Sequence, residues 1–310
     1  MTPLSKAVND YLAMRRSLGY KLIDMGYNLG HFVDFMHRHH ASVITTKLAL
    51  RWAVEPQQVS CAQWATRLGY VRSFARYWSA FDARTQVPPV GLLPFRFRRT
   101  TPYIYSSAEI QGLLKAATRL SPYRGLRPWT YYTVFGLLAV TGMRIGEVVR
   151  LERSDVDLMQ ALLTVRLTKF GKSRLVPLHP STVTMLDRYC RLRDQRFPHP
   201  SSSRFFLSNQ GRPLTECMVR WTFIKLSRQV GLRRVGDSSG PRLHDFRHYF
   251  AVTTLLRWYR SGVDVEQRLP VLSTFLGHAH VTDTYWYLSG VPELLALTKA
   301  RLEHRWEERS

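Results

Sequence analysis

A proline-rich, basic stretch about one third of the way along the chain limits how the chain can fold. Residues 85–100 read TQVPPVGLLPFRFRRT and contain three prolines, one glycine and three arginines. Because proline fixes φ and lacks an amide donor, this composition favours an extended connection over a helix or a strand. At 310 residues the chain is long enough for two domains that each bury a core. The expected division is a first domain of 1–84, a linker of 85–103 and a second domain of 104–310.

The first domain carries the apolar spacing of α-helices. Apolar residues recur three and four positions apart near 8–12, 29–36, 45–53 and 60–81. No alternation of apolar and polar residues, which would indicate a strand, precedes residue 100. We therefore expect a compact helical bundle.

The second domain begins with helices. Ser106 and Glu109 have the spacing of a capping box for a helix that runs through Ala117. The next helix is expected over 129–140 and stops at Gly142, because glycine favours the left-handed residue that ends many helices. Later helical patterns lie at 181–195, 215–230, 244–260, 268–276 and 293–307.

One β-hairpin interrupts these helices. Residues 161–167 and 173–178 are rich in Leu, Val and Thr, and a basic turn at 168–172 separates them. Two such runs around a short turn that contains glycine are typical of antiparallel strands. The expected fold class is therefore mainly α with a small β-hairpin or sheet, a helical domain being followed by an α+β domain.

The charge of the chain indicates a polyanionic partner. Forty-five Lys and Arg against 22 Asp and Glu give a net charge of +23. Residues 1–100 carry +9 and the remainder +14, so the excess lies on both domains and not on a tail. Two basic domains are typical of a clamp that neutralises phosphates along double-stranded DNA. The residues expected to contact DNA from the linker and the hairpin turn are Arg96, Arg98, Arg99 and Lys172.

Composition also excludes several classes of protein. No uninterrupted apolar run reaches the roughly 18 residues of a membrane-spanning helix, and the first twenty residues lack the sections of a secretory signal. We expect no membrane partner and a cytoplasmic, nucleoid-associated protein. Cys61, Cys190 and Cys217 lie far apart without CxxC spacing, which supports neither a disulfide framework nor a cysteine zinc site. Buried free thiols are expected.

Four separate segments carry the side chains of a reactive site. They are TGMRIGE with Arg144, the hairpin turn with Lys169, HDFRH with His244 and Arg247, and LGH, whose His278 precedes Tyr287 by nine residues. Taken singly each segment is weak, because an arginine in a turn is usually a surface charge and a lysine in a hairpin turn is ordinary. Their order and spacing carry the information.

In this order the segments resemble the catalytic domain of tyrosine recombinases, the phage integrase family. The resemblance covers about 104–290 closely, and the helical front domain resembles the family's core-binding domain more loosely, through length, charge and helicity. It implies an enzyme that cleaves and rejoins DNA through a 3′-phosphotyrosine, without ATP, metal or any other cofactor, as a tetramer on its DNA sites. The catalytic set that the resemblance implies is Arg144, Lys169, His244, Arg247, His278 and Tyr287.

The physical chemistry of the cationic residues agrees with this assignment. Cleavage of a phosphodiester builds negative charge on the non-bridging oxygens, and fixed donors aimed at those oxygens give the largest rate term. Arg144 and Arg247 offer planar, permanently charged groups that bind a phosphate in bidentate fashion. His278 would add a further hydrogen bond to the same phosphate.

The proton transfers agree as well. A phenol has an unperturbed pKa of about 10, so Tyr287 needs a neighbour such as His244 to accept or orient its proton. The 5′ oxygen of the sugar leaves poorly without a proton, which Lys169 on its turn can supply. Attack by tyrosine then conserves the energy of the broken bond for rejoining.

Several residues have rivals or other interpretations. Tyr285 is the alternative to Tyr287, since both could reach a phosphate from a flexible loop, and Lys172 is the alternative to Lys169. The nine-residue offset from His278 favours Tyr287.

Two histidine patterns suggest metal sites. Histidines occur at 31, 37, 39 and 40, but the last three do not share a helix face and no carboxylate or cysteine set completes them. His244 and His248 superficially resemble the HExxH motif of zinc proteases. Asp245 and Arg247 replace its elements, and a guanidinium beside a metal ion is unfavourable. We expect no metal site.

Other functions share parts of the pattern. A non-catalytic DNA-binding protein on this fold would more naturally have lost one of the six groups. A type IB topoisomerase shares the chemistry but relaxes supercoils as a monomer without site preference. A metal-dependent transposase needs a carboxylate cluster on a ribonuclease-like sheet, whereas strands are few and acidic residues sparse here. The favoured role is site-specific integration, excision or transposition of a mobile element.

The last expected helix, 293–307, follows Tyr287 after a Ser-Gly-Val-Pro break. Its apolar positions are Leu294, Leu295, Leu297, Leu302 and Trp306. Such a stripe has to be buried, either on the chain's own catalytic domain or, as the resemblance implies, on a neighbouring protomer. In the second case the helix would couple the tyrosine of one subunit to the next.

Overall fold

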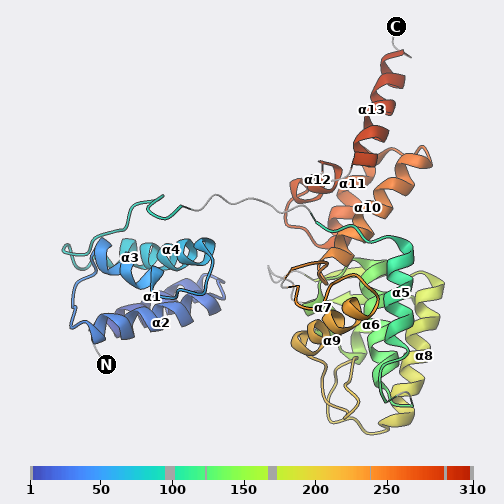
Figure 1. Cartoon of the computed structure of the whole chain (residues 1–310), viewed down its shortest axis with the longest axis horizontal. Helices are drawn as coiled ribbons and strands as arrows, with labels where there is room; N and C mark the ends of the chain where they lie inside the picture. Colours follow the sequence, from blue (N-terminus) through green and yellow to red (C-terminus); the bar gives the residue numbers. More distant parts are fainter. Residues whose placement is uncertain are drawn as a thin grey trace. The chain divides into compact units, whose positions relative to one another are not determined.

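The computed structural model divides the chain into two compact units, one within 1–100 and the other within 101–310. Figure 1 shows the elements of each unit, and each unit is described by itself. The structure describes residues 3–94, 102–122, 124–166, 173–237, 239–289 and 292–307.

The N-terminal unit is a bundle of helices, as its apolar spacing predicts. Its helices are α1 (Pro3–Ser17), α2 (Ile23–Arg38), α3 (Thr46–Val54) and α4 (Cys61–Trp78). The side chains of Thr45 and Ser60 accept from amides of the first turns of α3 and α4, so both helices begin at a capping residue. Phe32, Trp52 and Phe74 are fully buried between the helices and form the centre of this core.

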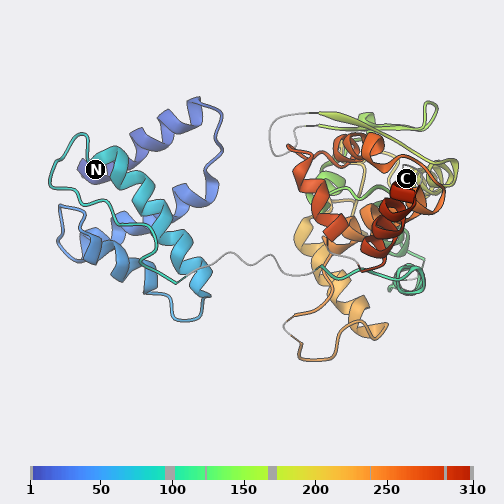
Figure 2. The same ribbon diagram turned by 90° about the horizontal axis from the view of Figure 1, so that it is seen from above.

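The C-terminal unit is mainly helical around a small sheet. Its helices are α5 (Ser107–Ala117), α6 (Arg127–Thr141), α7 (Ile145–Arg150), α8 (Pro180–Arg196), α9 (Glu216–Gln229), α10 (Asp245–Arg260), α11 (Val265–Leu276), α12 (Thr282–Ser289) and α13 (Pro292–Glu307). The strands β1 (Val156–Asp157), β2 (Leu162–Val165) and β3 (Arg174–Pro177) pair antiparallel in that order, after a short 3-10 turn at Arg153–Asp155. The sheet lies at one edge of the unit (Figure 2).

Local sequence signals account for most of these boundaries. The capping box of Ser106 and Glu109 is present at the start of α5. α6 begins two residues earlier than expected because Pro128 fits the first turn of a helix, where its missing amide is not needed. The predicted hairpin is confirmed as β2 and β3, which pair from Leu162 opposite Pro177 to Val165 opposite Arg174.

Three elements were not predicted. β1 has two residues and α7 has six, which is too short for a periodic pattern to identify. The expectation that Tyr285 and Tyr287 lie on a flexible loop was wrong, because both belong to α12. In this segment Thr284 and Tyr287 are buried and Tyr285 is exposed, so the sequence shows no single apolar stripe.

The cysteine expectation was also wrong for two of the three residues. Cys61 and Cys217 are exposed, and Cys190 is half-buried. Cys61 begins α4 and Cys217 lies in the first turn of α9, where helix ends meet solvent. All three are free thiols.

Two apolar clusters build the C-terminal unit. The larger one surrounds α6 and includes Phe135, Phe223 and Phe246, whose rings contact one another. The smaller one joins α10, α11, α12 and α13 and contains Tyr287 and Leu294. None of the helices in the described residues combines the length and the apolarity needed to cross a bilayer.

The final helix packs only partly on its own unit. Leu294 is fully buried against α10 and α12, and the hydroxyl of Thr298 donates to that of Tyr259 on α10. Leu295, another position of the predicted stripe, is 51% exposed. The later turns of α13 extend away from the rest of the unit (Figure 1). The side chains of Leu302 and Trp306 lie outside the described residues.

Candidate active site

Arg144 lies in the tight turn between α6 and α7. Gly142 ends α6 with a φ of +59°, which glycine adopts without strain, and a Cβ there would lie 2.8 Å from a ring carbon of Phe250. Arg144 is the N-cap of α7. The buried carboxylate of Glu147 accepts from its backbone amide at 3.1 Å and from its guanidinium at 3.0 Å. Glu147 thus supports this turn.

Arg247 is buried in the first turn of α10, and its guanidinium contacts the turn between α6 and α7. It donates to the carbonyl oxygens of Gly142 (2.9 Å) and Leu276 (2.7 Å). Burial lowers the pKa of Arg247 to about 10, and the hydroxyl of Tyr287 opposes this effect while the charge of Arg144 adds to it. The guanidinium therefore stays protonated at neutral pH.

A second glycine turn, at the end of α11, carries His278. Gly277 has a φ of +71°, and its carbonyl oxygen lies 3.4 Å from both terminal nitrogens of Arg144, which donate to it. Nδ1 of His278 and Oγ1 of Thr284 share a hydrogen bond of 2.7 Å, which orients the imidazole. The His278 ring stacks on that of Tyr287, with centroids 6.0 Å apart.

Tyr287 lies on α12 at the centre of these groups. Its phenol lies beside the guanidinium of Arg247, and its ring centroid is 5.3 Å from that of His248. The side chain is only 4% exposed. The rival Tyr285 is 51% exposed, because residues two positions apart on a helix face opposite ways.

His244 lies at the edge of the cluster, just before α10. Its ring is exposed and meets that of His248 edge-on, with centroids 5.2 Å apart. His248 therefore contacts both His244 and Tyr287. The sequence interpretation considered His248 only as part of a zinc motif and missed this position. The available signal was its four-residue offset from His244, which puts both on one helix face.

A second missed residue is Arg174, at the start of β3. Its side chain is 8% exposed and forms an ion pair with Glu147 at 2.8 Å. It lies two residues before the buried Val176, so both point to the interior side of the strand. A charged residue at an inward position of an otherwise apolar strand was the signal that could have found it.

The structure thus brings together Arg144, Arg247, His278 and Tyr287, with His244 beside them. The remaining candidates are Lys169, Lys172, Arg96, Arg98 and Arg99, which lie outside the described residues.

An arginine-rich cavity of about 600 Å³ opens beside Arg144. The arginines in its lining are Arg144, Arg150, Arg220, Arg233 and Arg242, and His244 joins them. The lining includes one carboxylate, that of Glu216, 3.6 Å from Arg150. Positive charge therefore dominates this cavity, which suits a phosphodiester backbone.

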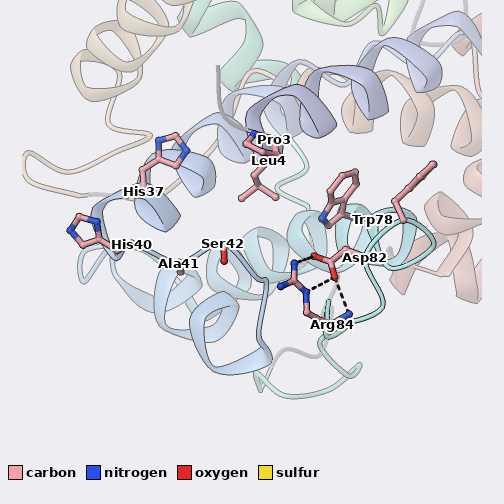
Figure 3. Close-up of a pocket in the computed structure, with 10 residues that line it drawn as sticks. Pro3, Leu4, His37, His40, Ala41, Ser42, Trp78, Asp82 and Arg84 are labelled. Atoms are coloured by element: carbon pink, nitrogen blue, oxygen red, sulfur yellow. Dashed lines mark hydrogen bonds and ion pairs between the residues drawn. The ribbon is translucent and has the colours of Figure 1, made fainter.

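A different cavity, of about 760 Å³, lies in the N-terminal unit (Figure 3). It brings together two of the four clustered histidines, His37 and His40, at one side, while Asp82 and Arg84 pair with each other at another. Within the described residues, no group of three or more His, Cys, Asp or Glu is arranged to hold a metal ion.

Comparisons with known proteins agree with the geometry. A model of the phage integrase family matches residues 105–291, which contain every segment around Tyr287. The chain belongs to the phage integrase family. It is a tyrosine recombinase, an enzyme that breaks and rejoins DNA strands. It is 51% identical over 315 residues to a Sinorhizobium fredii protein named "Putative integrase/recombinase y4rB", with 100% of both chains covered.

Solved tyrosine recombinase structures share the fold. One is the integrase of transposon Tn1549 in complex with transposon right-end DNA, with a TM-score of 0.68, 15% identity, and coverage of 98% of this chain and 99% of that one. Another is a lambda integrase tetramer bound to a Holliday junction, with a TM-score of 0.62, 18% identity, and coverage of 92% and 76%. At these identities the likeness shows the fold.

Proposed function

We propose that this recombinase integrates, excises or transposes a mobile DNA element, with Tyr287 as its covalent nucleophile. The observation that carries the proposal is the burial of Tyr287 beside Arg247 and against the ring of His278, where two glycine turns also hold Arg144. The relative that matches this chain over its whole length is named a putative integrase/recombinase, which supports the mobile-element role.

The two arginines bind the scissile phosphate. Each is already fixed by backbone carbonyl oxygens, so little reorganisation is needed when a phosphate arrives. Carbonyl oxygens carry only partial charge, and Glu147 is shared with Arg174, so positive charge remains for the phosphate. His278, oriented by Thr284, donates a further hydrogen bond to the same phosphate.

The cleavage step transfers one phosphoryl group and two protons. The Tyr287 oxygen forms a bond to phosphorus, and its proton passes to His244, directly or through a water molecule. The bond from phosphorus to the 5′ oxygen breaks, and that oxygen takes its electron pair and a proton from Lys169. The products are a 3′-phosphotyrosine and a free 5′ hydroxyl, and the reverse attack rejoins the strand.

The nucleophile has to become accessible before this step. Tyr287 is 4% exposed, packed between His248, His278 and Arg247. A phosphate that binds Arg247 competes for the donors that now face the phenol. DNA binding therefore shifts α12 relative to α10 and α11.

Double-stranded DNA is the partner of both units. The charge of +23 is spread over the two, and the Tn1549 integrase of the same fold was solved on DNA. The N-terminal helical unit acts as the core-binding half of the clamp, and Arg96, Arg98 and Arg99 follow the backbone between the halves. The protein is associated with the nucleoid for the same reason.

The active assembly is a tetramer on DNA. Lambda integrase of this fold was solved as a tetramer on a Holliday junction. In this chain the later turns of α13 leave their own unit, and Leu295 is exposed near the start of the helix. These turns dock on a neighbouring protomer, while Leu294 keeps the base of the helix on its own domain.

An adduct assay tests the proposed function. Duplexes from the DNA that flanks the coding region, each nicked near a candidate cleavage position, are incubated with the full chain and separated under denaturing conditions. A covalent protein–DNA product at one position is expected, with wild-type protein and not with Tyr287→Phe. Relaxation of plasmids without any site preference would instead favour the topoisomerase alternative.

A further inference from the structure

Arg174 connects the catalytic hairpin to the other catalytic segments. Its Nε donates to the carbonyl oxygen of Phe275 at 2.8 Å, and its two terminal nitrogens donate to the carboxylate of Glu147 at 2.8 and 3.2 Å. A Cβ on Gly277 would lie 2.6 Å from its Nη1, so the guanidinium also packs directly on the turn before His278. One side chain of the hairpin thus contacts two other segments, the end of α11 and, through Glu147, α7.

Glu147 extends this connection to Arg144. The carboxylate is 3% exposed and accepts from Arg174 and from Arg144 at the same time. Burial raises the pKa of Glu147, but hydrogen bonds and charge from Arg174 and Arg144 outweigh that effect and hold the pKa below its usual value. Because the carboxylate stays ionised, the bidentate pair with Arg174 is maintained at neutral pH.

The position of Arg174 on the hairpin makes this connection specific. Val165 pairs with Arg174 at the base of the turn that carries Lys169. On the other strand of the hairpin, Arg166 directly follows β2 and is hydrogen-bonded to the buried Asp155 of the 3-10 turn, which belongs to no catalytic segment. Arg174 therefore connects the strand after this turn to the segments around Tyr287.

We propose that Arg174 is a positioning residue for Lys169. By clamping the base of the hairpin to Glu147 and to the carbonyl oxygen of Phe275, it sets where the lysine meets the leaving 5′ oxygen. Arg174 itself does not contact the phosphate, because its side chain is 8% exposed and each of its three nitrogens already donates to a protein oxygen. The inference rests on the proposed function, in which Lys169 protonates that oxygen.

Leaving-group chemistry gives a test that a purely structural role would not satisfy. If sulfur replaces the bridging 5′ oxygen, it leaves as a thiolate, and a thiol has a pKa of about 8.5. A thiolate needs no proton at neutral pH, so the sulfur substrate does not require Lys169. A variant that harms only the delivery of that proton recovers on the sulfur substrate.

The experiment compares adduct formation on the nicked duplex found by the adduct assay, with oxygen or sulfur at the scissile position. The variants are Arg174→Gln, Arg174→Lys, Lys169→Ala, the double variant Arg174→Gln with Lys169→Ala, and the control Arg191→Gln. Arg191 is a surface arginine on α8 with a side chain 79% exposed, paired to Asp187. Thermal melting followed by circular dichroism checks folding, and Arg174→Lys carries the test if Arg174→Gln does not fold.

On oxygen we expect Lys169→Ala to lose about 10²- to 10⁴-fold in rate and Arg174→Gln about 10- to 100-fold. The Lys variant should be impaired too, since its single nitrogen cannot reach the carbonyl oxygen of Phe275 and both carboxylate oxygens of Glu147 at once. On sulfur all of these should come within a few fold of wild type. On oxygen the double variant should be no slower than Lys169→Ala, because both changes remove the same contribution.

Each contrary outcome has its own meaning. If Lys169→Ala recovers on sulfur and the Arg174 variants do not, or if the two losses multiply in the double variant, the positioning role is wrong and the proposed function stands. If Lys169→Ala does not recover on sulfur, the role of Lys169 fails and this inference fails with it. No adduct from the wild-type chain on either substrate would contradict the proposed function itself.

Discussion

The phenol of Tyr287 lies beside the buried guanidinium of Arg247 and opposes the burial that lowers the pKa of Arg247, and Arg247 is held by carbonyl oxygens at the ends of two different helices. The proposed nucleophile and the arginine proposed to bind the phosphate therefore occupy one buried cluster in the structure. Under the proposed function, this contact couples binding of DNA to Arg247 with release of Tyr287 for attack.

The first prediction concerns the identity of the nucleophile. Tyr287→Phe should abolish covalent attachment to nicked site DNA and leave DNA affinity intact, because only the hydroxyl is removed. The matched control is Tyr285→Phe on the exposed face of α12, which should retain attachment. The measurement is the denatured adduct together with a gel-shift affinity. The reverse pattern would show that the nucleophile has been assigned to the wrong residue.

The second prediction concerns metal ions. In the proposed mechanism, Arg144, Arg247 and Lys169 supply the positive charge that two-metal nucleases take from ions. Adduct formation should therefore persist in excess EDTA at the rate seen with magnesium. Loss of the adduct in EDTA and its return on adding magnesium would sink the proposed mechanism.

The third prediction concerns the linker. Replacing Arg96, Arg98 and Arg99 with glutamine should weaken DNA binding and flatten the slope of log affinity against log salt by about 3 at most, roughly one per lost phosphate contact. Titrations at several salt concentrations measure the slope. An unchanged slope would place these arginines away from the DNA backbone.

The fourth prediction separates the two parts of α13. Deleting 301–310 leaves Leu294 and Thr298 in place, so the catalytic unit should keep its melting temperature and cleave a nicked single site. Synapsis and complete recombination should fall much further, because the protruding turns are lost. Both activities are measured side by side, with light scattering on the DNA complex. Normal recombination by the shortened chain would rule out the docking role.

The fifth prediction concerns stability and pH. Glu147→Gln leaves the buried guanidinium of Arg174 without its carboxylate, which should cost about 3–5 kcal/mol in the free energy of unfolding. The pKa of Glu147 is lower in the folded chain than its usual value. Its stabilisation is therefore complete above the unfolded pKa of about 4.3 and is lost as the pH falls through the lower folded pKa.

Urea denaturation at neutral pH and through that acid range measures both effects. As the pH falls below about 4.3, the free energy of unfolding of Glu147→Gln should decrease less than that of wild type. A variant with wild-type stability at neutral pH would show that the ion pair contributes nothing net.

Prediction from sequence succeeded where short-range chemistry decides the structure. The capping box at Ser106 and the glycine end of α6 are local signals, and both appear as expected. α12 was taken for a loop because Thr284 and Tyr287 face the interior while Tyr285 faces solvent, which leaves a short segment without a clear stripe.

The supporting residues of the site were harder to find from sequence. Arg174 is distinguished from the other arginines by burial against Glu147 and Phe275, segments far from it in the chain. His248 is distinguished by its contact with Tyr287, which depends on how α12 packs on α10. Such relationships are set by tertiary packing, and no spacing within one segment encodes them.

The bonds that close this site also determine when it can exist during protein synthesis. Arg144 donates to Gly277 and Arg247 donates to Gly142, so each bond joins segments more than a hundred positions apart. At roughly 5–20 residues per second, Tyr287 is added about 7–30 s after Arg144. A ribosome-bound chain can therefore fold its N-terminal helices and meet DNA long before it is able to cut it.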